Sequence, residues 1–294
     1  MRAAPLELSR TVFGLSFQNP LVLAAGTAGF GRELAGVMDL DRLGGLVTKA
    51  VSLAPRAGNA PPRVAEFRGG MLNSVGLANP GLERVRAELL PWLARHVVRA
   101  RVLVNVVGFT VEEYAQVVAG LDGVPGLAGF ELNLSCPNTS AGGIEFGAEP
   151  ECVRRIVASC RARTRLPISA KLSPVLPDIP GMAIVARDAG ADAISVVNTL
   201  PGLLLAEEGA DPRLGNGNGG VSGPVLLPVG VLAVARVVER TGGMPVIGVG
   251  GVRSAADVRQ YLRVGASLVG VGTAALADPR LPERIIRELE RGHG

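Results

Sequence analysis

Short, largely apolar segments alternate along the chain with longer stretches in which apolar residues recur at helical spacing. Each short segment is four or five residues long. Strands of this kind are typical of a parallel sheet that is covered on both faces. We therefore predict eight strands, at residues 21–25, 45–49, 102–106, 130–134, 168–172, 193–197, 246–249 and 268–271.

The stretches between these segments carry helix start signals and one apolar face. Thr110 with Glu113 has the spacing of a capping box, and Ser254 with Asp257 opens a second helix in the same way. The apolar faces that follow consist of Tyr114, Val117, Val118 and Leu121, of Val258, Tyr261 and Leu262, and, in a further helix, of Val153, Ile156, Val157 and Cys160. Cys160 is therefore expected to be a small core residue.

Eight strands alternating with helices favour a closed (β/α)8 TIM barrel, formed as a single domain by residues 1–294. A doubly wound open sheet is the alternative, but Gly-x-Gly-x-x-Gly would be expected after its first strand. Here Ala-Gly-Thr-Ala-Gly-Phe-Gly, ending at Gly31, has a different spacing. Residues 52–82 and 201–223 follow the second and sixth strands. They predict extended loops at the C-terminal face, where barrel enzymes carry their active sites.

Composition excludes several classes of function. The net charge is only +4 and aromatic residues make up 3%, so nucleic-acid binding is not expected. The longest uncharged run, residues 215–235, is broken by asparagine and proline, so no membrane-spanning helix is expected. No secretory signal is expected either. The three cysteines form neither a disulfide framework nor a metal site. The chain is therefore expected in a reducing compartment, the cytoplasm.

Few side chains are suited to acid–base or cationic roles. The two histidines are His96 and His293, so histidine chemistry is not expected. Only two of the 30 basic residues are lysines, Lys49 and Lys171, and each ends a predicted strand. Arginine cannot replace lysine where a compact ammonium is needed. Such a lysine could form a Schiff base, as in barrel aldolases, pair with an anion, or stabilise a reduced flavin.

The ends of the last two predicted strands indicate a phosphate site. Gly250-Gly251 and Gly272-Thr273 follow neighbouring strands. Glycine lets backbone N–H groups approach a phosphate, and this pair of loops is the frequent phosphate site of barrels. Two ordinary glycine turns are the alternative.

A thiol and several amides gather at the same predicted face. Cys136 lies just past the fourth strand. A thiol with a pKa of about 8.5 can act as a base at neutral to mildly alkaline pH, although a buried structural thiol fits the position equally well. Amide side chains, which suit the imide edge of a pyrimidine or flavin ring, end three strands or lie in adjoining loops, at Asn105, Asn133, Asn198, Asn73 and Asn138.

Taken together, these motifs resemble the dihydroorotate dehydrogenase family. The segments that carry the resemblance are Asn133-Leu-Ser-Cys-Pro-Asn138, Asn73-Ser-Val-Gly-Leu77, Gly250-Gly251 and Gly272-Thr273. It extends over essentially the whole chain. It implies flavin-dependent oxidation of (S)-dihydroorotate to orotate in de novo pyrimidine (UMP) biosynthesis, with FMN as the cofactor and no metal.

The resemblance also implies a class within the family. Cysteine at position 136, with no N-terminal membrane extension expected, is similar to the soluble class 1 enzymes, because class 2 enzymes use serine there. Residues 138–147 are similar to class 1B, whose catalytic subunit passes electrons to NAD⁺ through an FAD and [2Fe–2S] subunit. A homodimer, or a heterotetramer with that subunit, is implied. A fumarate-dependent class 1A enzyme, a related dihydropyrimidine-oxidising flavin barrel and a non-catalytic binding subunit remain alternatives.

The site residues implied by the resemblance follow position by position. FMN contacts are expected at Ala25, Gly26, Lys49, Ala50, Asn105, Asn133, Lys171, Val197, Gly223, Gly250, Gly251, Gly272 and Thr273. Substrate contacts are expected at Lys49, Asn73, Ser74, Val75, Gly76, Leu77, Asn133, Asn138, Asn198 and Thr199. Many relatives have serine where this chain has Ala25, so only a backbone contact can remain there.

The resemblance further implies how the reaction proceeds. The Cys136 thiolate takes the C5 proton of dihydroorotate while hydride leaves C6 for flavin N5. Lys49 lies between the substrate carboxylate and the flavin, and Lys171 supports negative charge on the reduced ring. Residues 135–146 are expected to act as a lid that excludes water.

Overall fold

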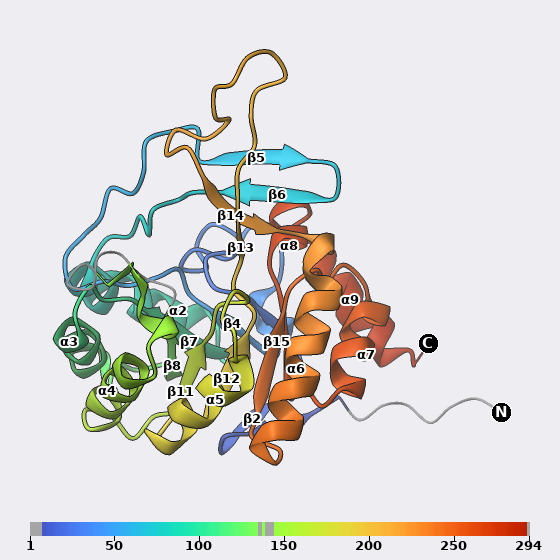
Figure 1. The fold of residues 1–294 in the computed structure, drawn as a ribbon. Helices are drawn as coiled ribbons and strands as arrows, with labels where there is room; N and C mark the ends of the chain where they lie inside the picture. The colour runs from blue at the N-terminus through green and yellow to red at the C-terminus, as the bar shows by residue number, and fades with distance from the viewer. Residues whose placement is uncertain (1–7, 135–136, 139–143, 293–294) are drawn as a thin grey trace.

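The computed structural model describes residues 8–134, 137–138 and 144–292. Eight parallel strands close into a barrel with helices around it, which confirms the predicted (β/α)8 architecture (Figure 1). In order around the barrel the strands are β3 (Leu21–Leu23), β4 (Gly45–Val47), β7 (Arg101–Val106), β8 (Leu127–Asn133), β11 (Ile168–Lys171), β12 (Ala193–Val196), β15 (Val246–Val249) and β16 (Leu268–Val271), and β16 pairs with β3 to close the ring.

The helical segments lie mainly between consecutive barrel strands. They are η1 (Leu40–Arg42), α1 (Leu82–Arg84), η2 (Val85–Leu89), α2 (Leu90–His96), α3 (Val111–Leu121), η4 (Phe146–Ala148), α4 (Pro150–Arg161), α5 (Ile179–Asp188), η5 (Pro224–Leu226), α6 (Leu227–Thr241), α7 (Ala255–Arg263), α8 (Thr273–Ala277) and α9 (Leu281–Glu290). The predicted starts of α3 and α7 are confirmed, because Thr110 and Ser254 each accept a hydrogen bond from the N–H three residues on, at 3.2 Å.

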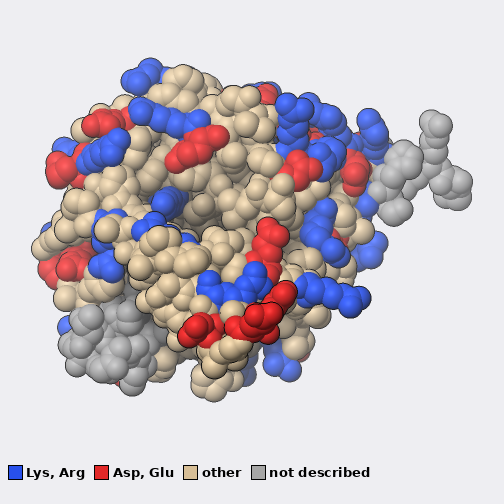
Figure 2. Space-filling view, turned by 90° about the horizontal axis from the view of Figure 1, so that it is seen from above, with Lys and Arg blue, Asp and Glu red and all other residues tan. Residues whose placement is uncertain are grey.

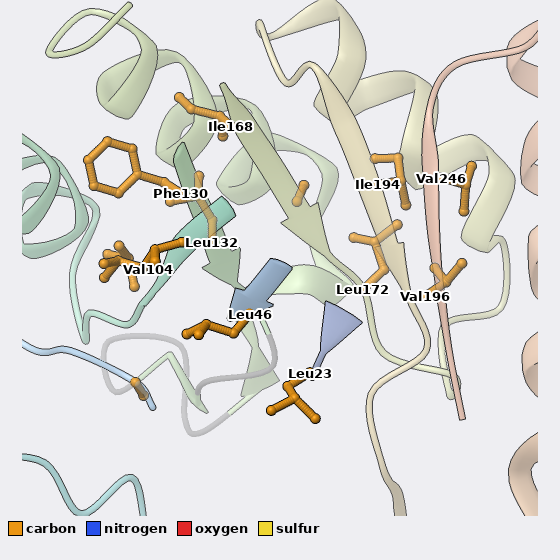
Figure 3. Packing of buried hydrophobic residues seen from close by; sticks show 14 of the residues in the cluster. Leu23, Leu46, Val104, Phe130, Leu132, Ile168, Leu172, Ile194, Val196 and Val246 are labelled. Carbon is orange, nitrogen blue, oxygen red and sulfur yellow. The ribbon is translucent and has the colours of Figure 1, made fainter. Parts of the chain in front are cut away.

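The main hydrophobic core lies between the barrel strands and the surrounding helices. Figure 3 shows part of this cluster, including Leu23, Leu46, Val104, Phe130, Leu132, Ile168, Ile194 and Val246. Cys160 of α4 is fully buried in it, and this burial raises the pKa of its thiol to about 12. Its prediction as a core residue is confirmed.

The lower end of the barrel is apolar and closed. A hairpin of β1 (Arg10–Val12) and β2 (Leu15–Phe17) precedes β3. Phe17 is fully buried and packs with Leu103, Ile247 and Leu268, which come from three different barrel strands. Ligand chemistry is therefore left to the opposite end.

A small antiparallel sheet lies above the C-terminal ends of the barrel strands (Figure 1). Its strands are, in order, β13 (Leu200–Gly202), β14 (Gly219–Ser222), β6 (Gly70–Asn73) and β5 (Val64–Phe67). The two segments predicted as extended loops at this face supply these strands. Their strands are only three or four residues long, and most contain glycine, so the sequence pattern did not reveal them.

Two further elements complete the described chain. A two-residue pair, β9 (Pro137–Asn138) with β10 (Ile144–Glu145), follows β8 in antiparallel register. None of the helices within the described ranges is both long enough and apolar enough to cross a membrane.

Candidate functional site

Three polar side chains from neighbouring strands meet inside the upper end of the barrel. Asn105 on β7, Glu131 on β8 and Lys171 at the end of β11 are 1%, 2% and 7% exposed. Leu103, two residues before Asn105, belongs to the apolar cluster inside the barrel. Because side chains alternate along a strand, Asn105 faces the same interior. We call Asn105, Glu131 and Lys171 the polar layer.

Glu131 joins the other two members of the polar layer. The amide Nδ2 of Asn105 donates a hydrogen bond to Glu131 Oε1 at 2.8 Å, and Lys171 Nζ lies 3.8 Å from the same oxygen. Burying a carboxylate or an ammonium is costly unless it is paired, and this arrangement pairs both. Lys171 Nζ donates no hydrogen bond to another described residue, so its N–H donors remain for a ligand.

Two more of the predicted asparagines meet above the polar layer. Asn198 Nδ2 donates to Asn133 Oδ1 at 3.3 Å, and Asn198 Oδ1 accepts from the N–H of Thr199 at 2.8 Å. The Tyr114 hydroxyl of α3 donates to the backbone carbonyl of Asn133 at 2.6 Å. The end of β8 is thereby fixed from the helix side, and the amides of two strands face one another.

The loops after β15 and β16 offer backbone N–H groups. Gly250 and Gly251 have φ angles of 129° and 74°, in the region that favours glycine. A Cβ on Gly251 would lie 2.4 Å from the backbone nitrogen of Leu227, at the start of α6. The N–H groups of Gly251 and Gly272 donate no hydrogen bond to other described residues. This arrangement suits a phosphate oxygen.

Both glycine loops are tied to neighbouring elements. Thr273 Oγ1 donates to Ser222 Oγ of β14 at 2.8 Å, and the Tyr261 hydroxyl of α7 donates to the carbonyl of Gly250 at 2.8 Å. Gly223 follows β14 with φ 102°, and a Cβ there would lie 2.8 Å from the backbone of β6. The antiparallel sheet and the two loops therefore form one connected rim.

The predicted substrate segment, residues 73–77, begins with the last residue of β6 and ends in a turn. Asn73 Nδ2 donates to the Gly220 carbonyl at 3.1 Å, and Asn59 Nδ2 donates to Ser74 Oγ at 2.8 Å. Leu77 has φ 57°, a left-handed conformation that is uncommon for leucine, and its carbonyl accepts a hydrogen bond from Asn79 Nδ2 at 2.8 Å.

Lys49 follows β4 at the same face and is partly buried. Its backbone N–H donates to the carbonyl of Gly29 at 2.8 Å, which joins the end of β4 to the segment after β3. Figure 2 shows this upper face with a hollow near its centre and Lys or Arg atoms at the edge of the hollow. The remaining predicted cofactor contacts also lie at strand ends on this face, at Ala25, Gly26, Ala50 and Val197.

The predicted base and most of the predicted lid lie outside the described residues. This applies to Cys136, to residue 135 and to residues 139–143. The backbone of Asn138 belongs to β9, where it is the register partner of Ile144.

Sequence reasoning missed two residues of this rim. Glu131 was not assigned a role, although a charged residue inside an apolar strand, two positions before Asn133, is the signal that could have revealed it. Tyr261 was assigned to the apolar face of its helix. It is indeed buried, but its hydroxyl also holds Gly250.

A second hollow of the described surface is lined by groups that bond one another. This hollow, of about 600 Å³, lies at the N-terminal end of the barrel and is lined by Gln18, Asn19, Arg42 and Glu290 among others. Its Arg42 pairs with Glu290 at 3.4 Å, and Asn19 bonds the backbone of Arg42 at 2.8 Å, so these groups serve the fold. No three His, Cys, Asp or Glu side chains in the described ranges are grouped as metal ligands.

The fold and the rim define a (β/α)8 barrel whose site lies at the C-terminal ends of its strands. Comparison with known proteins narrows this class. The family model for dihydroorotate dehydrogenase matches residues 7–292. The chain therefore belongs to the dihydroorotate dehydrogenase family, and the resemblance that the sequence motifs indicated is confirmed.

Individual relatives agree with this family. The chain is 47% identical over 280 residues to the dihydroorotate dehydrogenase B (NAD⁺) catalytic subunit of Desulforudis audaxviator, covering 95% of this chain and 90% of that protein. It is 45% identical over 285 residues to the protein of the same name from Pelobacter propionicus, covering 97% and 93%. The relative of that name from Cutibacterium acnes is 44% identical over 287 residues, covering 97% and 92%.

Proposed function

We propose that this chain is the FMN-binding catalytic subunit of a class 1B dihydroorotate dehydrogenase, acting as one barrel domain in the cytoplasm. It oxidises (S)-dihydroorotate to orotate in pyrimidine biosynthesis. The observation that carries the proposal beyond family membership is the buried polar layer beneath a rim of glycine loops. The polar layer supplies an amide and a lysine at one end of the site, and the glycine loops supply backbone N–H groups at the other.

The residues of the rim fit FMN in two respects. Gly250-Gly251 and Gly272-Thr273 would hold its phosphate, because the N–H groups of Gly251 and Gly272 have no partner among the described residues. Asn105 and Lys171 would face the ring, since both are buried and Lys171 Nζ keeps donors for a ligand. The other contacts follow the family positions, at Ala25, Gly26, Lys49, Ala50, Asn133, Val197 and Gly223.

The amides of the rim fit a small, polar ring as substrate. Asn133 and Asn198 bond one another. We assign both to the substrate, together with residues 73–77, Asn138 and Thr199. Amides can donate to ring carbonyls and accept from ring N–H groups. Lys49 is assigned to the substrate carboxylate, for which an ammonium is a suitable partner.

In the proposed mechanism the chain moves a proton and FMN, when bound, supplies the two-electron acceptor for hydride from C6 of the substrate. Cys136, as the thiolate, removes the proton from C5. Asn133, Asn198 and the turn of residues 73–77 hold the ring in register with the base. Lys171 would place its positive charge beside the flavin ring, where negative charge increases when the ring is reduced.

The electron route beyond this subunit is also a proposal. The relatives named above are called catalytic subunits of an NAD⁺-dependent enzyme, which implies a partner in those proteins. For this chain we propose a homodimer that joins an FAD and [2Fe–2S] subunit in a heterotetramer and passes electrons through it to NAD⁺.

The proposal is tested by purifying the chain alone and with that partner subunit. The chain alone should be yellow, release FMN on denaturation, and convert dihydroorotate to orotate with an artificial acceptor. NAD⁺ reduction should require the partner. A colourless protein that borohydride traps with a carbonyl substrate would instead indicate an aldolase. Turnover of dihydrouracil but not dihydroorotate, or fumarate reduction by the chain alone, would contradict the assigned substrate or class.

A further inference from the structure

Glu131 has no role in the proposed reaction, although it contacts two residues assigned to the flavin. It is 2% exposed, lies on β8 directly opposite Asn105 in the strand register, and accepts the Asn105 amide at 2.8 Å. Two residues that the proposed function assigns to the flavin, Asn105 and Lys171, are thus both in contact with a carboxylate that faces neither solvent nor the glycine loops.

The contact with Asn105 fixes which way that amide is turned. A carboxylate can only accept hydrogen bonds, so the nitrogen of the Asn105 amide has to face Glu131. The amide oxygen then points away from the carboxylate as a free acceptor. Asn105 therefore presents a carbonyl to an imide N–H of the ligand, and Glu131 is what selects this orientation.

The contact with Lys171 sets the charge of the layer. The two groups lie 3.8 Å apart at low exposure, where each charge is felt more strongly than in water. A lone ammonium beside a ring would favour the reduced, more negative state of that ring. The carboxylate offsets this preference. Ser169 and Ser195 are the register partners of Glu131 and Lys171 on the neighbouring strands, and their hydroxyls bond one another at 2.9 Å, so they add no further charge.

We propose that Glu131 is a positioning residue that orients Asn105 and offsets the charge of Lys171, and that it thereby lowers the reduction potential of the bound flavin. The inference rests on the proposed function, because it needs a flavin at this rim. It goes beyond that function by assigning the carboxylate a role in how readily the flavin accepts and gives up electrons, which substrate binding does not require.

The test is the flavin midpoint potential, measured against a reference dye in the FMN-loaded protein. Glu131→Gln keeps the shape of the side chain and an oxygen that can accept from Asn105, but removes the charge. We expect the reduction equilibrium to shift about tenfold or more toward the reduced flavin, about 30 mV for a two-electron couple. Ser195→Ala is the matched control, since it removes a buried hydrogen bond without changing charge, and it should leave the potential near that of the wild type.

A second pair of variants keeps the test decisive if Glu131→Gln does not fold. Lys171→Gln should shift the potential in the opposite direction, and the double variant E131Q/K171Q, which replaces an ion pair with two amides, should lie near the wild type. The difference between the double variant and K171Q then reports the Glu131 charge alone.

The inference is wrong if flavin binds and Glu131→Gln leaves the potential unchanged, if the double variant matches K171Q, or if Ser195→Ala shifts the potential in the same way as E131Q. Failure of the wild-type protein to bind any flavin would instead contradict the proposed function, so the two failures are distinguishable.

Discussion

A thiol acts as a base only where it can ionise near neutral pH, and the described cysteines of this chain are in unsuitable places. Cys160 is buried in the helix core, where its pKa is raised to about 12, and it remains a protonated packing residue. Cys152 lies on the same helix, is partly buried and packs against this core. Cys136 follows the strand that carries Glu131 and Asn133, which is why the proton transfer is assigned to it.

Replacement of the thiol should separate flavin binding from turnover. Cys136→Ala should keep FMN but lose about 10²- to 10⁴-fold in turnover, the usual contribution of a general base. Cys136→Ser should keep a little activity, greatest at high pH, because a hydroxyl gives up its proton less readily than a thiol. Steady-state rates with dihydroorotate across a pH series would measure this, with Cys152→Ala as the control. An FMN-loaded Cys136→Ala protein with wild-type turnover would remove Cys136 from the mechanism.

At the scale of elements, the rim depends on how closely the loop after β15 approaches the start of α6. Gly251 has φ 74° and no room for a Cβ, whereas Gly242, the cap at the other end of α6, has φ 69° and open space around it. The two glycines therefore share a backbone conformation but differ in packing. They form a matched pair for testing the loop.

Gly251→Ala should weaken FMN binding, because the new Cβ has to push the loop away from Leu227 and with it the N–H groups assigned to the phosphate. We expect the FMN Kd to rise at least about tenfold. Gly242→Ala should lose about 1 kcal/mol of stability from its backbone strain and keep the FMN affinity. Fluorescence titration of the apoproteins with FMN and thermal unfolding measure both effects. Equal FMN affinity in the two variants would argue against the phosphate assignment.

The elements differ in how well the sequence predicted them, for physical reasons. β15 and β16 were predicted with their observed bounds, since glycine turns follow uniformly apolar segments. β8 begins three residues before its predicted start, because Gly129 interrupts the apolar run. The sheet above the barrel was missed, because its short strands are specified by pairing between distant segments such as β6 and β14. Glu131 was missed because its partners, Asn105 and Lys171, are neighbours only once the barrel closes.

Across the whole molecule, polarity separates the two ends of the barrel. The lower end is filled by an apolar cluster and closed by the β1–β2 hairpin, while the upper end carries the polar layer, the asparagines and the glycine loops beneath the antiparallel sheet. Segments as far apart in sequence as β6 and β14 pair over this upper end (Figure 1). A ligand that spans the rim would therefore contact most of the barrel strands.

We expect one ring system to lie between the Cys136 thiol and the glycine loops after the last two strands. A crystal structure of the chain with FMN and orotate tests this arrangement most directly. We predict the phosphate against Gly250-Gly251 and Gly272-Thr273, the ring beside Asn105 and Lys171, and the Cys136 sulfur facing the bound orotate. A Cys136 sulfur on the opposite rim, or turned into packed core away from the flavin, would contradict the account.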